Sequence, residues 1–174
     1  MLTVTANVFQ TELGWMAFAG NRHGMTHLTF GHETEEAALI ASESFPMAVL
    51  NDLPAWWEPA QSQLIAYAAG EQVDLSSIPV DLGPATEFQQ LVRERVRGLG
   101  YGETASYGDI ASDVGSPGAA RAVGNIMARN PIPLVIPCHR VIGSGGRLGG
   151  FSAPSGLDMK RHLLAMEQRA ESLF

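Results

Sequence analysis

The sequence predicts an α+β protein in which a small antiparallel sheet with helices precedes a mostly helical second half. The first 30 residues alternate loosely between apolar and polar side chains, with turn residues such as Gly14 and Gly24 between the apolar runs. Segments with helix start and stop signals follow. A connection at 73–83 that contains proline and glycine separates the halves, so we expect domains at 1–80 and 81–174.

Helices are expected wherever an apolar periodicity lies between a capping residue or proline and a closing glycine. The second expected helix starts after Pro54 and ends at Gly70, and the third is closed by Gly98. Outside a central helix pair, the predicted helices cover residues 33–43, 55–69, 85–97 and 156–170.

The central pair is the most regular part of the sequence. Ser106 is a suitable N-cap for a short helix that runs through Val114, and Asp109 lies favourably in its first turn. Gly115 ends this helix. A second helix follows directly, so the sequence predicts a helix-turn-helix.

The second helix of this pair is expected to start at Ser116 as N-cap, with Pro117 at its first position, and to end near Ala128. Its residues are mostly small, so Arg121 is the one long polar side chain before Arg129. A slim helix with one projecting arginine suits a narrow groove better than base reading in a wide one. The alternative is a pair of structural helices that only pack together.

Composition points to an intracellular, cytoplasmic protein. The chain has 174 residues, 45% of them hydrophobic, and a single cysteine, which excludes an internal disulfide and a cysteine-based zinc cluster. The N-terminus lacks the basic start and apolar run of a signal peptide. No stretch approaches the roughly 20 apolar residues of a membrane span.

Charge is unevenly distributed along the chain. The net charge is −7, but residues 1–78 carry nine acidic and one basic residue (−8), whereas 79–174 carry nine acidic and ten basic (+1). No acidic residue occurs between Asp113 and Asp158, where four arginines fall: Arg121, Arg129, Arg140 and Arg147. Such a block favours a surface that faces phosphate groups, against the alternative of four merely solvated arginines.

The single cysteine, Cys138, directly precedes His139 at the end of a short apolar segment bracketed by prolines. This arrangement is typical of an activated nucleophile, although an isolated cysteine is more often a small buried hydrophobe. In an extended segment the two side chains would point to opposite faces, so a bridging water is expected unless the backbone turns. The carboxylate of Glu167 is the candidate that would orient His139.

Two further patterns receive less weight. The glycine-rich run 143–150 lacks the ending of a P-loop and the spacing of a dinucleotide site, so we expect a mobile loop over a site. His23, His27 and His32 lie in a predicted hairpin and loop without a partner cysteine, which favours surface histidines over a metal site.

The stretch Pro137-Cys-His-Arg-Val-Ile142 resembles the active-site signature of the O6-alkylguanine-DNA alkyltransferases, the methylated-DNA–protein-cysteine methyltransferase family. The resemblance covers about residues 84–168, whereas the first 80 residues fit only in size and coarse pattern. It implies a ribonuclease H-like N-terminal domain and a winged helix-turn-helix domain that binds DNA and carries the catalytic cysteine. The other matching segments are Ser106-Tyr107, Ala119–Gly124, Asn130–Pro133, Gly150–Ser152 and Leu163–Glu167.

The resemblance implies a role for each matching catalytic residue. Cys138 would accept the alkyl group, His139 would be the water-mediated base, and Glu167 would orient it. Tyr107 would donate to the guanine ring nitrogen and crowd the 3′ phosphate, which assists extrusion of the base. Asn130 would brace the turn between helix and active-site segment.

Arg121 resembles the finger that fills the place of the extruded base. The resemblance also implies that Pro133, Val135, Phe151 and Ser152 line the base pocket, and that Ser116, Ala119, Ala120 and Ser144 lie against the DNA. Phe151 replaces a tyrosine found in some members, so a hydroxyl contact is lost there. The N-terminal cysteines that bind zinc in some members are missing, so no metal and no cofactor are expected.

The implied activity is direct-reversal repair, in which each molecule acts once on O6-alkylguanine flipped out of double-stranded DNA. Minor-groove binding by a monomer, without a membrane, is implied, and activity on O4-alkylthymine is left open. One alternative is a non-catalytic damage-sensing DNA-binding module, but such proteins replace the cysteine that this chain retains. The other is a winged-helix transcription factor, which would need no Cys-His pair and normally reads the major groove.

Overall fold

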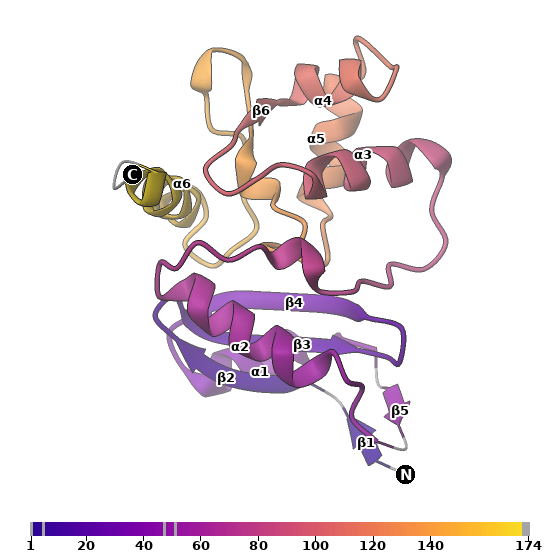
Figure 1. Cartoon of the computed structure of the whole chain (residues 1–174), viewed down its shortest axis with the longest axis vertical. Helices are drawn as coiled ribbons and strands as arrows, with labels where there is room; N and C mark the ends of the chain where they lie inside the picture. The colour runs from indigo at the N-terminus through magenta and orange to yellow at the C-terminus, as the bar shows by residue number, and fades with distance from the viewer. Residues whose placement is uncertain (1, 5, 47, 51, 172–174) are drawn as a thin grey trace. The chain divides into compact units, whose positions relative to one another are not determined.

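The computed structural model describes residues 2–4, 6–46, 48–50 and 52–171. The chain divides into two compact units, Met1–Gly83 and Pro84–Phe174, and each is described by itself. The first unit combines a small antiparallel sheet with helices and the second is mostly helical, which confirms the predicted α+β class (Figure 1). None of the described helices is long and apolar enough to cross a membrane.

A three-stranded antiparallel sheet forms the centre of the first unit, in the order β2 (Asn7–Thr11), β3 (Gly14–Gly20), β4 (Met25–His32). The predicted meander is therefore present and extends two residues further than the alternation indicates. Gly14 opens β3 with a φ of 94°, and a Cβ there would approach the carbonyl oxygen of His32 to 2.7 Å. Only glycine fits this tight turn without strain.

Two helices, α1 (Glu35–Ser42) and α2 (Trp57–Ala68), complete the first unit. An aromatic cluster joins α2 to the sheet, with the ring centroids of Phe18 and Trp57 4.8 Å apart. A separate antiparallel pair, β1 (Leu2–Val4) with β5 (Ala48–Leu50), has no counterpart in the sequence-based prediction.

Residues 73–83, predicted as a connection, are in fact bonded to the sheet of the first unit. They contain the short 3₁₀ helix η1 (Leu75–Ser77). Met25 of β4 donates its N–H to Pro79, and its carbonyl accepts the N–H of Asp81. These backbone bonds explain why the first unit extends to residue 83.

The second unit has four α-helices among its described residues: α3 (Glu87–Arg97), α4 (Tyr107–Asp113), α5 (Ala120–Ala128) and α6 (Leu157–Glu171). A short parallel pair, β6 (Ala105–Ser106) with β7 (Val141–Ile142), and the 3₁₀ turns η2 (Cys138–Arg140) and η3 (Ser144–Gly146) connect them. The start of α4 follows the prediction. Ser106 and Asp109 form a reciprocal capping box over 3.0 and 2.9 Å.

The second helix of the predicted helix-turn-helix starts later than the sequence indicates. α5 begins at Ala120, and its N-cap, Ala119, makes no side-chain capping bond. Gly118 adopts a φ of 92°, which interrupts any helix that starts at Ser116. Ser116 therefore lies in the turn, where its carbonyl accepts the N–H of Ala119 over 3.0 Å.

Candidate active site

A braced turn leads from α5 to the cysteine. The Asn130 side chain donates to the carbonyl of Ile136 over 2.8 Å and accepts the N–H of Ile132 over 3.1 Å. Leu134, buried at the centre of the turn, has a φ of 70°, which non-glycine residues rarely adopt. The contacts of Asn130 are those that a brace of this turn requires.

The backbone turns at the cysteine instead of continuing as an extended segment. Cys138 begins the 3₁₀ helix η2, and its N–H bonds to Ile136 over 2.7 Å. The extended segment expected from the sequence is therefore absent at Cys138, and the backbone takes the turn that the same expectation left open. His139 and Cys138 are both buried, and the cysteine retains 5% of its surface exposed.

Cys138 lines a pocket of about 250 Å³ in the second unit. Phe151 and Ser152 line it, as the sequence predicts. Pro133 and Val135, also predicted as wall residues, are buried but are not among the lining residues. The sequence did not reveal three of the residues that line the pocket: Met127, Ala128 and Gly150.

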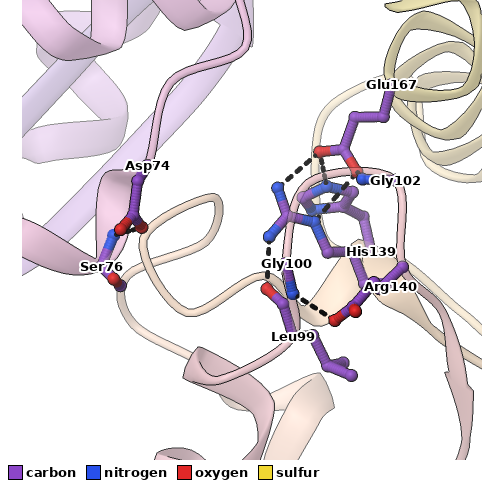
Figure 2. Close-up of polar contacts among 9 residues, drawn as sticks. Asp74, Ser76, Leu99, Gly100, Gly102, His139, Arg140 and Glu167 are labelled. Atoms are coloured by element: carbon purple, nitrogen blue, oxygen red, sulfur yellow. Dashed lines mark hydrogen bonds and ion pairs between the residues drawn. The ribbon is translucent and has the colours of Figure 1, made fainter. Parts of the chain in front are cut away.

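Glu167 of α6 reaches the turn that carries the cysteine. Its Oε1 lies 2.7 Å from His139 Nε2, and both side chains are fully buried (Figure 2). An ionised carboxylate only accepts hydrogen bonds, so the ring carries its proton on Nε2. The lone pair of the neutral imidazole is then on Nδ1, which assigns the basic atom of His139.

Arg140 lies in a different environment from the one that the sequence predicts. The sequence predicts it among the arginines of a phosphate-facing surface, but Arg140 is buried and holds Glu167. Its Nε and Nη2 each donate to one carboxylate oxygen over 2.9 Å, and Nη1 donates to the carbonyl of Leu99 over 2.7 Å (Figure 2). The N–H of Gly102 adds a fourth bond to the carboxylate, at 3.1 Å. In the sequence, the position of Arg140 beside the Cys138-His139 pair was the only signal of this contact.

The network fixes the ionisation of its members. Burial alone would raise the pKa of Glu167, but the hydrogen bonds and charges of His139 and Arg140 hold it far below its usual range. Burial lowers the pKa of His139 in spite of the carboxylate, so the ring is neutral at neutral pH. Burial also raises the pKa of the Cys138 thiol, against a hydrogen bond from Asn130 and the charge of Lys160. The resting site therefore pairs a thiol with a neutral imidazole.

Tyr107, the first residue of α4, lines the same pocket. Burial and the nearby sulfur of Cys138 raise the pKa of its hydroxyl, so it remains a proton donor. A Cβ on Gly149 would overlap this hydroxyl, so the glycine-rich loop lies directly against the tyrosine. Lys160 Nζ lies 5.9 Å from the centroid of the ring.

The residues predicted to face DNA lie on or near α5 and in the glycine-rich loop. Arg121, near the start of α5, is exposed, as is Ser144 in η3. Ser116, Ala119 and Ala120 are half-buried in the turn and at the start of α5.

The three N-terminal histidines are not all on the surface. His23 is exposed, but His27 and His32 are half-buried on β4, where burial lowers the pKa of each. His32 Nε2 lies 2.7 Å from Thr29 Oγ1, and His27 packs on the ring of Phe45. Among the described residues, no three His, Cys, Asp or Glu side chains are grouped as in a metal site.

A helix-turn-helix unit that carries a buried thiol beside a histidine–carboxylate pair defines a DNA-binding protein with a cysteine nucleophile. Comparison of the chain with known proteins places it in the same class. Residues 87–169 match the DNA-binding domain of 6-O-methylguanine DNA methyltransferases. The methylated-DNA–protein-cysteine methyltransferase of Methanosarcina acetivorans is 39% identical over 165 residues, which cover 92% of this chain and 96% of the relative.

A second relative of that name, from Mycolicibacterium paratuberculosis, is 41% identical over 91% of this chain and 89% of its own. The crystal structure of Mycobacterium tuberculosis OGT in complex with DNA superimposes with a TM-score of 0.73 at 35% identity, covering 95% of this chain and 94% of the other. The chain therefore belongs to the methylated-DNA–protein-cysteine methyltransferase family, which confirms the resemblance seen in its motifs.

Replacing Glu167 with glutamine should show how far the fold depends on this carboxylate. Because its pKa is lower in the folded chain than the 4.5 of an ordinary glutamate, its ionised form stabilises the fold above about pH 4.5, and this stabilisation is lost as the pH falls further. Glu167→Gln should cost about 3–5 kcal/mol at pH 7 by leaving Arg140 buried without its anion. It should also flatten the loss of stability in acid.

Chemical denaturation from pH 7 to pH 3 measures both effects. Asp158→Asn is the control, because that exposed carboxylate pairs only with exposed Arg161 and its loss should change little. A Glu167→Gln variant as stable as the unaltered protein at pH 7 would contradict the assignment.

Proposed function

We propose that this protein repairs double-stranded DNA by transferring an alkyl group from O6-alkylguanine to the sulfur of Cys138. The observation that carries the proposal is the placement of the Cys138 thiol at the pocket, in a turn whose next residue, His139, is held by a buried carboxylate. The names of the relatives support the same reaction. All residues assigned to it fall in 84–174, so we propose this unit as the DNA-binding and catalytic domain.

The first step is removal of the thiol proton. His139 is neutral and its Nε2–H is committed to Glu167, so Nδ1 is the atom that takes the proton, through a bridging water. The resulting imidazolium lies against an ionised carboxylate that Arg140 keeps in place. The network thus lowers the cost of forming a thiolate that burial alone would disfavour.

The second step moves the alkyl group. The sulfur–carbon bond forms as the bond between that carbon and guanine O6 breaks, and the electron pair passes into the base. The Tyr107 hydroxyl protonates a ring nitrogen of the leaving guanine, and the imidazolium returns a proton to the tyrosine. Removing the alkyl group from the thioether would require a thiolate to leave an unactivated carbon, so the product persists and each molecule acts once.

Access to the alkyl carbon requires that the base leave the helix, at a cost of a few kcal/mol. We propose that the small-faced helix α5 docks in the minor groove and that Arg121, exposed near its start, fills the vacated place. The flipped base would enter the pocket between Tyr107 and Phe151. One copy of the chain supplies all these groups, so a monomer suffices.

Incubation with duplex DNA that contains O6-methylguanine should add one methyl group to Cys138. Peptide mass spectrometry after digestion measures the added mass and its position. Cys138→Ala should retain affinity for the same DNA while acquiring no methyl group, which separates transfer from binding. Unmodified protein after exposure to substrate that a known methyltransferase repairs would refute the proposal, and so would transfer to the alanine variant.

Arg121→Ala should slow reaction with duplex DNA while leaving reaction with a free O6-alkylguanine base nearly unchanged. The arginine stabilises the opened duplex, and the free base needs no opening. Single-turnover rates on both substrates measure the contrast. Arg161→Ala is the matched control, since Arg161 is also exposed but lies on α6, outside the helix proposed to dock. Equal losses on the two substrates in Arg121→Ala would refute the role.

Gly149→Ala should slow transfer by about 100-fold, because the new Cβ overlaps the Tyr107 hydroxyl and displaces the proton donor by about 1 Å. Gly108→Ala is the matched control, since Gly108 is exposed outside the pocket and a Cβ there meets only Ser106 Oγ, at an ordinary 3.7 Å. Single-turnover rates on methylated duplex provide the measurement. Similar rates in the two variants would show that the position of Tyr107 does not limit the reaction.

A further inference from the structure

Lys160 of α6 is completely buried, which is rare for a lysine. Its Nζ donates to the carbonyl of Val141 over 2.7 Å and lies above the ring of Tyr107, 5.9 Å from the centroid. Among the described residues, no carboxylate forms an ion pair with it. Burial of an ammonium is costly unless an anion compensates it, so this position calls for a negative charge nearby.

The sulfur of Cys138 is the group that can supply this charge. The charge of Lys160 acts on the thiol and that of the thiolate acts on the lysine, whose own pKa burial lowers. The other titratable groups around the sulfur do not take this role. Tyr107 on α4 is a neutral phenol, His139 is a neutral ring, and the ionised Glu167 is committed to Arg140 and His139.

We propose that Lys160 is the counter-cation of the Cys138 thiolate and a positioning residue for Tyr107. The amine is held to Val141, three residues after the cysteine, so the positive charge stays fixed relative to the sulfur. Its place above the Tyr107 ring lets one cation act on both the nucleophile and the proton donor. The inference deepens the proposed function, because it rests on Cys138 as the reacting atom.

Transfer of an alkyl group prevents the sulfur from ionising. A thioether has no proton to lose, so among the described residues Lys160 would keep the Val141 carbonyl and the face of Tyr107 as partners. The alkylated protein therefore carries a buried cation whose anion can no longer form. The two ionisations are therefore coupled in both directions. The charged lysine promotes ionisation of the thiol, and the thiolate promotes protonation of the lysine.

The thiol end is tested by the rate of Cys138 alkylation with iodoacetamide between pH 5 and pH 10, which follows the thiolate fraction and needs no DNA. Lys160→Met, similar in shape but neutral, should raise the pKa of the thiol by about one unit or more and slow reaction at pH 7 by about tenfold. Lys160→Arg should recover most of the rate. Arg161→Met, which alters an exposed cation on the same helix, should match the unaltered protein.

The lysine end is tested without a variant, in case Lys160→Met does not fold. The Lys160 Nζ and Cε resonances, followed by NMR across pH, should show a lower pKa after Cys138 has been methylated than before. An unchanged thiol pKa in folded Lys160→Met, or an unchanged lysine pKa after methylation, would overturn the proposal. Both measurements use reagents other than alkylated DNA, so failure of the repair activity would be seen separately.

Discussion

The buried carboxylate of Glu167 is the constraint on which the rest of the site depends. It accepts bonds from His139, from two nitrogens of Arg140 and from the N–H of Gly102. A carboxylate without exposed surface is tolerated only when such partners are present, so the helix α6, the turn η2 and the loop at 99–102 must assemble together. The position of the turn that carries Cys138 therefore follows from the hydrogen-bond requirements of one buried carboxylate.

This arrangement reconciles two needs that oppose each other. A sulfur that must meet an extruded base is shielded from water, and burial disfavours its ionised form. In the proposed mechanism the neutral imidazole takes the proton, and the fixed carboxylate and the buried lysine stabilise the charges that then arise. Under this proposal the thiol stays protonated at rest, as its raised pKa indicates, and ionises when a substrate is present.

Local signals in the sequence located most of the helices, because caps such as the Ser106–Asp109 box act within one turn. They failed where a distant contact decides the backbone. The turn at Cys138 depends on Asn130 bonding to Ile136. The late start of α5 has a local cause, the positive φ of Gly118, which the sequence does not distinguish from a helical conformation. Arg140 and Lys160 look like ordinary surface charges in a sequence, since burial of a cation leaves no local trace. Glu167 could be predicted only from the family resemblance and from its place on the last helix.

The uneven charge of the chain affects how the protein first encounters DNA. Residues 1–78 carry a net charge of −8 and residues 79–174 carry +1. A polyanion repels the first segment and tolerates the second, so encounters of DNA with residues 79–174 are favoured over encounters with residues 1–78. A higher ionic strength screens these charges. It therefore weakens the preference for one orientation of the encounter as well as the strength of the encounter.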